Sequence, residues 1–212
     1  SFVVNPIFFP GGDIGKLAVC GTINDLAMNG AKPLYLTLGL ILEEGLKVSS
    51  LKQIIKSVAS TAKEAEVKIV AGDTKVVPRG KGGKIYINTT GIGVLGPEVK
   101  LKNSEPKLGD KIIVSGTLGE HGATILASRE DFDLDHQLNS DCALLSNLVQ
   151  KVLKVSSKVK LLRDPTRGGI ATTLNEIAHY YQLGISLVEA KLPILTRVHN
   201  LANILGIDPL YF

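Results

Sequence analysis

The sequence contains no tryptophan, and five tyrosines and five phenylalanines make aromatic residues only 5% of its 212 positions. A packed interior must therefore consist of leucine, isoleucine, valine and alanine, and a hydrophobic fraction of 44% is sufficient for an ordered core. The cysteines, Cys20 and Cys142, are too few for a disulfide framework, which favours a reducing, cytoplasmic location. Each is expected to be a packed side chain rather than a nucleophile.

Long apolar runs are also missing. The longest, residues 34–42, is too short to span a bilayer, and no signal peptide is visible, so the sequence excludes a membrane protein. The formal charge of +4 is mildly basic and suits an anionic small-molecule ligand. Because the lysines are scattered and no aromatic-basic stripe occurs, nucleic-acid binding is excluded. The chain begins at Ser1 and ends at Phe212, and we expect both ends to be cut from inside a longer protein.

The strongest helix signal lies in residues 13–33. Apolar and small residues recur there at helical spacing: Ile14, Leu17, Ala18, Gly21 and Met28. Asp13 is placed to cap the first turn, because its carboxylate can accept from free backbone N–H groups. Gly30 and Pro33 supply the stop signal.

Asn24 and Asp25 interrupt the small and apolar residues of this helix. An aspartate is a poor helix former and is costly to bury without a partner. We therefore expect a cation, a metal ion or a set of donors to compensate Asp25. The alternative is a solvated helix face on which Asp25 points at water.

Strand and helix signals alternate along the rest of the chain. Strand patterns occupy residues 1–9, 34–42, 67–71, 85–95, 111–115 and 185–190. Helical spacing marks residues 49–62, 121–129, 143–152, 170–181 and 197–205. This mixture predicts an α/β or α+β protein in which residues 34–42 form a buried central strand. The polar stretch 98–110 predicts a linker between a first domain, 1–97, and a second, 111–212.

Two further aspartates occupy the ends of predicted elements. Asp73 follows the strand at 67–71 in a Gly-Asp-Thr turn, and Asp164 precedes a helix whose N-terminus, with Arg167 beside it, suits an anion. Well-separated aspartates suit Mg²⁺, which takes oxygen ligands, keeps waters and bridges phosphates. The alternatives are an Asx-turn for Asp73 and a helix cap for Asp164.

Several other sites can be excluded from the motif spacing. A Walker phosphate loop fails because Pro10 and Leu17 replace its first glycine and its Mg²⁺-binding serine or threonine. Lys16 either meets a phosphate or lies on the surface. The histidines lack zinc-site spacing, and only His121, near a turn, is a candidate for a functional role.

Four motifs together resemble a known superfamily. They are FFPGGDIGKLA (8–18), GTINDLAMNGAKP (21–33), AGDTKVV (71–77) and DPTRGG (164–169). In this order they resemble the aminoimidazole ribonucleotide synthetase superfamily over essentially the whole chain. The first and last are specific for its HypE branch, which acts in hydrogenase maturation. The Asn-Asp-Leu-Ala run is shared with selenophosphate synthetase and thiamine-phosphate kinase.

The resemblance implies a two-domain PurM-like fold. Its first domain is a mixed sheet with helices that forms a dimeric barrel through its strands, and its second domain is α/β. ATP and Mg²⁺ bind in a cleft between the domains. By resemblance the metal ligands are Asp25 and Asp73, with Asp164 as a third. By the same resemblance the ATP contacts are Asp13, Lys16, Asn24, Asp25, Asp73, Thr74, Arg167 and Gly168.

The implied reaction is the ATP-dependent dehydration of a carbamoyl group, carried on a C-terminal cysteine thiol, to a thiocyanate. Its cyanide becomes an iron ligand in nickel-iron hydrogenase. Phosphorylation turns the amide oxygen, a poor leaving group, into a good one. The implied partners are a second copy of the chain, the carbamoyltransferase that loads the thiol, and the hydrogenase iron-assembly scaffold proteins.

Two departures from the family pattern limit this expectation. Family members carry an aspartate just before the position of Ser1, and a terminal cysteine beyond the position of Phe212. We therefore expect this chain to bind nucleotide weakly and not to turn over. The alternatives are another ATP-using enzyme of the superfamily, acting on selenide or a thiamine phosphate, and a non-catalytic scaffold that docks maturation partners.

Overall fold

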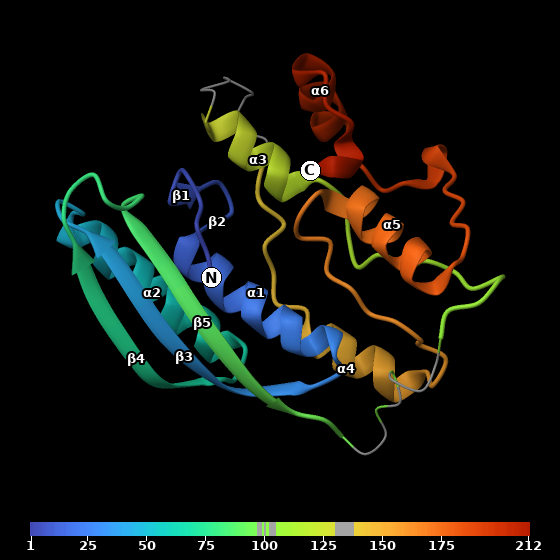
Figure 1. Cartoon of the computed structure of the whole chain (residues 1–212), viewed down its shortest axis with the longest axis horizontal. Helices are drawn as coiled ribbons and strands as arrows, with labels where there is room; N and C mark the ends of the chain where they lie inside the picture. Colours follow the sequence, from blue (N-terminus) through green and yellow to red (C-terminus); the bar gives the residue numbers. More distant parts are fainter. Residues whose placement is uncertain (97–98, 100, 102–104, 130–137) are drawn as a thin grey trace. The chain divides into compact units, whose positions relative to one another are not determined.

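The computed structural model describes residues 1–96, 99, 101, 105–129 and 138–212 (Figure 1). The chain divides into two compact units. Unit 1 consists of Ser1–Phe8, Gly12–Leu101 and Cys142–Val159, and unit 2 of Phe9–Gly11, Lys102–Asp141 and Lys160–Phe212. The predicted linker at 98–110 lies partly outside the described residues, so the predicted domain boundaries stay a proposal.

The described residues of unit 1 form a three-stranded sheet in the order β4–β3–β5. The central strand β3 (Lys32–Glu43) runs parallel to β4 (Lys68–Val77) and antiparallel to β5 (Ile85–Val94). The central strand predicted at 34–42 is therefore confirmed. The prediction that this strand is buried was wrong for one of its two faces. Leu36 and Leu40 are buried, whereas Tyr35 and Ile41 are 40% and 44% exposed, because the helices cover only one face of the sheet.

Helix α1 (Ile14–Met28) packs against α2 (Val48–Glu64) and β5. The predicted helix and its cap are confirmed, because Asp13 Oδ1 accepts from the N–H groups of Gly15 and Lys16 at 2.7 and 3.0 Å. Gly30, at φ +78°, takes the left-handed conformation that ends the helix. Helix α4 (Ser146–Val155) packs against α1 and β3, and it begins later than the predicted start at 143.

Three predicted strands were wrong. Residues 1–9 do not form one strand. They contain a single bridge from Phe2 to Ile87 and the short β1 (Phe8–Phe9), which pairs with β2 (Gly12–Asp13). Pro6 interrupts the segment because it has no N–H to donate to a ladder. Residues 111–115 are not a strand, and Ile113 is 89% exposed. Residues 185–190 end in the 3₁₀ helix η2 (Glu189–Lys191). Neither segment has a ladder partner among the described residues, and a strand requires one.

Unit 2 is mainly helical in its described part. Its elements are α3 (Glu120–Arg129), α5 (Gly169–Tyr181), α6 (Thr196–Leu205) and the 3₁₀ helix η3 (Pro209–Tyr211). The helices predicted at 121–129, 170–181 and 197–205 are confirmed to within one residue. Helices α3 and α6 share an apolar cluster that includes Ala123, Val198 and Leu201, and α5 packs against η3. Within the described residues, no helix combines the length and the apolar character needed to cross a membrane.

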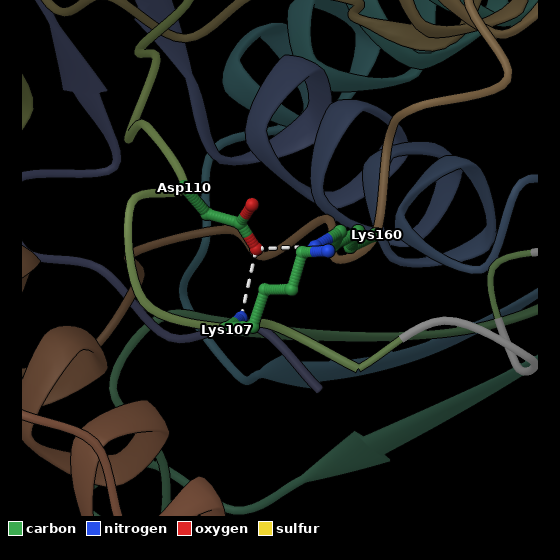
Figure 2. Close-up of polar contacts among 3 residues, drawn as sticks. All are labelled: Lys107, Asp110 and Lys160. Atoms are coloured by element: carbon green, nitrogen blue, oxygen red, sulfur yellow. Dashed lines mark hydrogen bonds and ion pairs between the residues drawn. The ribbon is translucent and has the colours of Figure 1, made fainter.

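Asp110, at the end of the predicted linker, fastens two parts of unit 2 (Figure 2). Its Oδ2 accepts from the Lys160 ammonium at 2.6 Å and from the Lys107 N–H at 2.8 Å. These two donors, the Lys160 ammonium first, hold the pKa of Asp110 below its ordinary value. Asp110 thus stabilises the turn 107–110 and joins it to Lys160, in the segment that leads to α5.

His121 lies at the start of α3 in a half-buried site of unit 2. Its Nδ1 is 2.8 Å from Ser140 Oγ, and its ring meets the edge of Phe9 with centroids 5.4 Å apart. Burial lowers the pKa of His121, and the neighbouring Asp141 carboxylate opposes this shift only in part. The folded protein therefore favours the neutral imidazole.

This lowered pKa predicts a pH dependence of stability. The unfolded chain takes up a proton near the ordinary histidine pKa of 6.5, and the folded chain does so only at lower pH. The free energy of unfolding should therefore fall as the pH drops through 6.5, and His121→Asn should weaken this fall. Urea unfolding between about pH 8 and about pH 5 measures it. The exposed His199 provides the matched control, His199→Asn. Equal pH dependence in both variants and the parent would contradict the assignment.

Candidate functional site

The polar side of α1 carries Lys16, Cys20 and Asn24 at intervals of four residues, so their side chains lie one above another. Together with α2 and residues 142–144, this side of α1 encloses a cavity of about 180 Å³ in unit 1. The cavity is lined by Lys16, Cys20, Thr61, Glu64, Cys142, Ala143 and Leu144. Lys16 is half-buried and is one of the residues that line this cavity.

Asn24 hydrogen-bonds to the backbone that leads into α4. Its Nδ2 donates to the Ala143 carbonyl at 2.9 Å, and its Oδ1 accepts from the Leu145 N–H at 2.9 Å. Both ends of the amide thus pair with backbone groups that would otherwise need other partners. The predicted contact of Asn24 with a nucleotide stays a prediction, and the structure gives the side chain a structural role.

Asp13 is buried at the N-terminus of α1, and its carboxylate serves the cap described above. Asp25, nearer the other end of α1, is exposed. The Asp25 backbone carbonyl accepts from Asn29 Nδ2 at 3.0 Å, which supports the last turn of the helix. The exposure of Asp25 agrees with the alternative of a solvated helix face.

Asp73 and Thr74 lie within β4, so the predicted Gly-Asp-Thr turn was wrong. The strand continues to Val77 because β3 pairs with it throughout, with Asp73 opposite Gly39. Paired residues of neighbouring strands point to the same face, so Asp73 shares the face of Tyr35 and Ile41, away from α1. Its exposed carboxylate accepts from the Thr74 N–H at 2.8 Å.

Asp164, Arg167 and Gly168 come together in sequence just before α5 in unit 2. Gly168 is the N-cap of α5 at φ 67°, and no side chain among the described residues caps this helix. The alternative of Asp164 as a helix cap was therefore wrong, and its backbone carbonyl accepts from the Thr166 N–H at 3.1 Å. Arg167 is exposed beside an uncapped helix N-terminus, which is an arrangement suited to an anion.

No three histidine, cysteine, aspartate or glutamate side chains in the described part of the chain are grouped so as to hold a metal ion. The predicted set of Asp25, Asp73 and Asp164 therefore stays a prediction. Asp25 and Asp73 are exposed hard oxygen donors. They fit an ion such as Mg²⁺, which retains waters and takes further ligands from phosphates.

The sequence did not predict the contact between Cys20 and Cys142. The two side chains hydrogen-bond to each other, and this contact, followed by burial, raises the pKa of Cys20. Each cysteine was expected to be packed or incidental rather than a nucleophile, and no contact between them was predicted. The two cysteines lie far apart in the chain, and spacing in sequence carries no signal of a contact made by the tertiary fold.

Comparison with known proteins places this geometry in a family. Residues 1–95 match the model of the AIR synthase related protein N-terminal domain, and residues 107–212 match that of its C-terminal domain. The carbamoyl dehydratase HypE of Cupriavidus necator is 53% identical over 211 residues. That match covers 100% of this chain and 60% of the relative, so the chain spans about 60% of the length of that protein.

Solved structures agree with the sequence match. The crystal structure of a HypE–HypF complex is similar with a TM-score of 0.94 and 51% identity, covering 100% of this chain and 69% of the other. A crystal structure of the hydrogenase maturation protein HypE in complex with ATP has a TM-score of 0.94 and 48% identity, covering 100% of this chain and 63% of the other. The chain therefore belongs to the AIR synthase related protein family and, within it, to the HypE group of hydrogenase maturation proteins.

Proposed function

We propose that the whole protein catalyses the ATP-dependent dehydration of a carbamoyl group on a C-terminal cysteine thiol to a thiocyanate, which supplies cyanide for nickel-iron hydrogenase. One observation carries the proposal: 53% identity, along the full chain, to a protein named carbamoyl dehydratase HypE. A HypE structure with the same fold holds ATP, which supports the use of ATP. This identity favours dehydration over the superfamily alternatives that act on selenide or a thiamine phosphate.

The residues of this chain suit the handling of a nucleotide phosphate. Lys16 supplies an ammonium group beside the unit 1 cavity, and Arg167 a guanidinium beside the N-terminus of α5. Gly168 takes a left-handed conformation at that N-terminus, and a Cβ there would collide with Thr172, so the start of α5 requires glycine at this position. We assign these groups to phosphate contacts, in which fixed positive charge favours the charge that develops on a transferred phosphoryl group. Asp13, Asn24 and Thr74 are proposed as further contacts to ATP.

Asp25 and Asp73 are proposed as Mg²⁺ ligands, with Asp164 as a third. Mg²⁺ bound with ATP would neutralise phosphate charge during phosphoryl transfer. The exposure of Asp25 supports this assignment, because the ion must also reach water and phosphate oxygens.

The metal assignment predicts a loss of affinity that depends on Mg²⁺. In calorimetric titrations, Asp25→Ala and Asp73→Ala should each weaken Mg²⁺–ATP binding at least about tenfold, or about 1.4 kcal/mol. Both should bind ATP like the parent when the metal is chelated. Glu44→Ala, which removes an exposed carboxylate elsewhere, is the matched control. If both aspartate variants bind Mg²⁺–ATP as tightly as the parent, the assignment fails.

The reaction itself requires the full-length protein with a carbamoylated terminal cysteine. That protein should release ADP and phosphate and acquire a thiocyanate, which mass spectrometry detects. A full-length protein that binds its partners but never hydrolyses ATP would favour the non-catalytic scaffold. The carbamoyltransferase partner is supported by the HypE–HypF complex, and the iron-assembly scaffold is proposed as the acceptor of the cyanide.

We also propose that two copies of the chain join through the sheet of unit 1 into a dimeric barrel. The face of the sheet away from α1 exposes apolar side chains: Tyr35, Ile41, Ile92 and Val94. An apolar sheet face normally packs against another layer. The described part of unit 1 leaves this face open, and a second copy offers a matching surface through two-fold symmetry.

The dimer proposal predicts the effect of a charge on the open sheet face. The parent should sediment as a dimer, and Ile41→Glu should sediment as a monomer, because two buried carboxylates would face each other across the symmetry axis or lie unpaired. Ile55→Glu, at a 38% exposed site on α2, is the matched control and should stay dimeric. A monomeric parent, or a dimeric Ile41→Glu variant, would contradict the proposal.

A further inference from the structure

Cys20 and Cys142 meet inside unit 1. Cys20, in the middle of α1, is only 2% exposed, and Cys142 lies in the extended segment before α4 with part of its surface exposed. Both side chains line the cavity of about 180 Å³ described above, and they hydrogen-bond to each other. Both are free thiols in this structure.

Two independent constraints hold the thiols together. The rotation of α1 is fixed by the complete burial of Val19 and Ile23, and this turns Cys20 toward the cavity. One helical turn further on, Asn24 fastens the backbone of Ala143 and Leu145 through two hydrogen bonds of 2.9 Å. Cys142 immediately precedes the residues that Asn24 holds. This contact therefore keeps Cys142 next to the turn of α1 that contains Cys20.

We propose that Cys20 and Cys142 form a reversible disulfide, and that this pair is a site of oxidative modification by low-molecular-weight disulfides such as oxidised glutathione. Covalent closure needs neighbouring side chains on elements that already lie together. Both conditions hold at this site. The modification joins α1 to the segment before α4, beside Lys16.

The reaction begins at Cys142, because an oxidant reaches the more exposed sulfur first. The Cys142 thiolate attacks one sulfur of oxidised glutathione, which forms a mixed disulfide and releases one glutathione thiolate. Cys20 then gives its proton to that thiolate and attacks the Cys142 sulfur, which releases the second glutathione thiolate. The proton lost when the Cys142 thiolate formed is taken up by this second glutathione thiolate. Overall, the two protein thiols lose two protons and two electrons, and one oxidised glutathione becomes two reduced glutathione molecules.

The surroundings of Cys20 make the second step the slow one. In the reduced pair, the hydrogen bond with Cys142 and then burial raise the pKa of the Cys20 thiol. Burial remains after Cys142 is modified, and it disfavours the Cys20 thiolate that the second step needs. The same burial shields the finished bond. We therefore expect this disulfide to form slowly and to be reduced slowly. It would then respond to sustained oxidation and not to a brief exposure.

The oxidised protein should also be more resistant to unfolding. A bond between positions 20 and 142 encloses most of the chain in a loop, and long closed loops restrict the unfolded state most. We expect the thermal midpoint to rise by several degrees on oxidation and to return on reduction.

The test incubates the complete chain with excess oxidised glutathione, followed by alkylation in denaturant without reductant. Intact mass spectrometry should find a monomer that has lost two hydrogens and accepts no alkyl group, whereas the reduced protein should accept two. A non-reduced peptide map should show the peptides of Cys20 and Cys142 joined. Dithiothreitol should restore both thiols and the original thermal midpoint.

Cys142→Ser is the matched variant, since it keeps a hydrogen-bonding partner for Cys20 and removes the reactive sulfur. After oxidation it should retain one alkylatable thiol, at Cys20, and its thermal midpoint should not shift. The proposal is overturned if the oxidised parent still accepts two alkyl groups. It is equally overturned if Cys142 retains glutathione without joining Cys20, or if the cross-link forms only between two chains. These readouts do not involve ATP, so they are independent of the proposed reaction.

Discussion

Ile14, Ala18, Val19, Ile23 and Ala27 of α1 are each 0% exposed, so this helix cannot turn about its axis without uncovering several of them. Each larger aliphatic side chain among them gains about 1.5–3 kcal/mol from burial. That burial fixes the direction of every other side chain on α1. Lys16, Cys20 and Asn24 consequently face the cavity and residues 142–145, while Asp25 remains at the surface.

The fixed helix in turn arranges the polar groups of unit 1. The Asp13 carboxylate satisfies two N–H groups of the first turn, and Asn24 satisfies a carbonyl and an N–H before α4. The two Asn24 bonds join α1 to the segment 142–145 on both sides of Leu144, so they favour one path for that segment. The thiol pair and the position of Lys16 both follow from that path. Unit 2 contributes different groups, namely Arg167 and the uncapped N-terminus of α5, that suit an anion.

Local signals predicted the parts of the fold that depend on neighbouring residues in the chain. The cap at Asp13, the stop at Gly30 and the spacing of apolar residues define α1, and β3 follows from its run of leucine and isoleucine. The turn at Asp73 was wrong because pairing with β3 extends β4 past it. The strands at 111–115 and 185–190 were wrong because a short apolar run does not make a strand unless another strand pairs with it, and none in the described part of the chain does. The candidate site shows the same division: the sequence singled out Asp25, Asp73 and Arg167 as candidates, whereas the roles of Asn24 and Cys142 depend on contacts between distant segments.

The central claim is that α1 holds the segment 142–145 through Asn24. Hydrogen exchange of the Leu145 amide, followed by NMR under native conditions, tests it most directly, because that N–H donates to Asn24 Oδ1. The amide should exchange slowly in the parent, lose most of its protection in Asn24→Ala, and keep it in Asn29→Ala, which removes an exposed amide from the same helix end. A Leu145 amide that exchanges rapidly in the parent, or that is equally protected in Asn24→Ala, would contradict the claim.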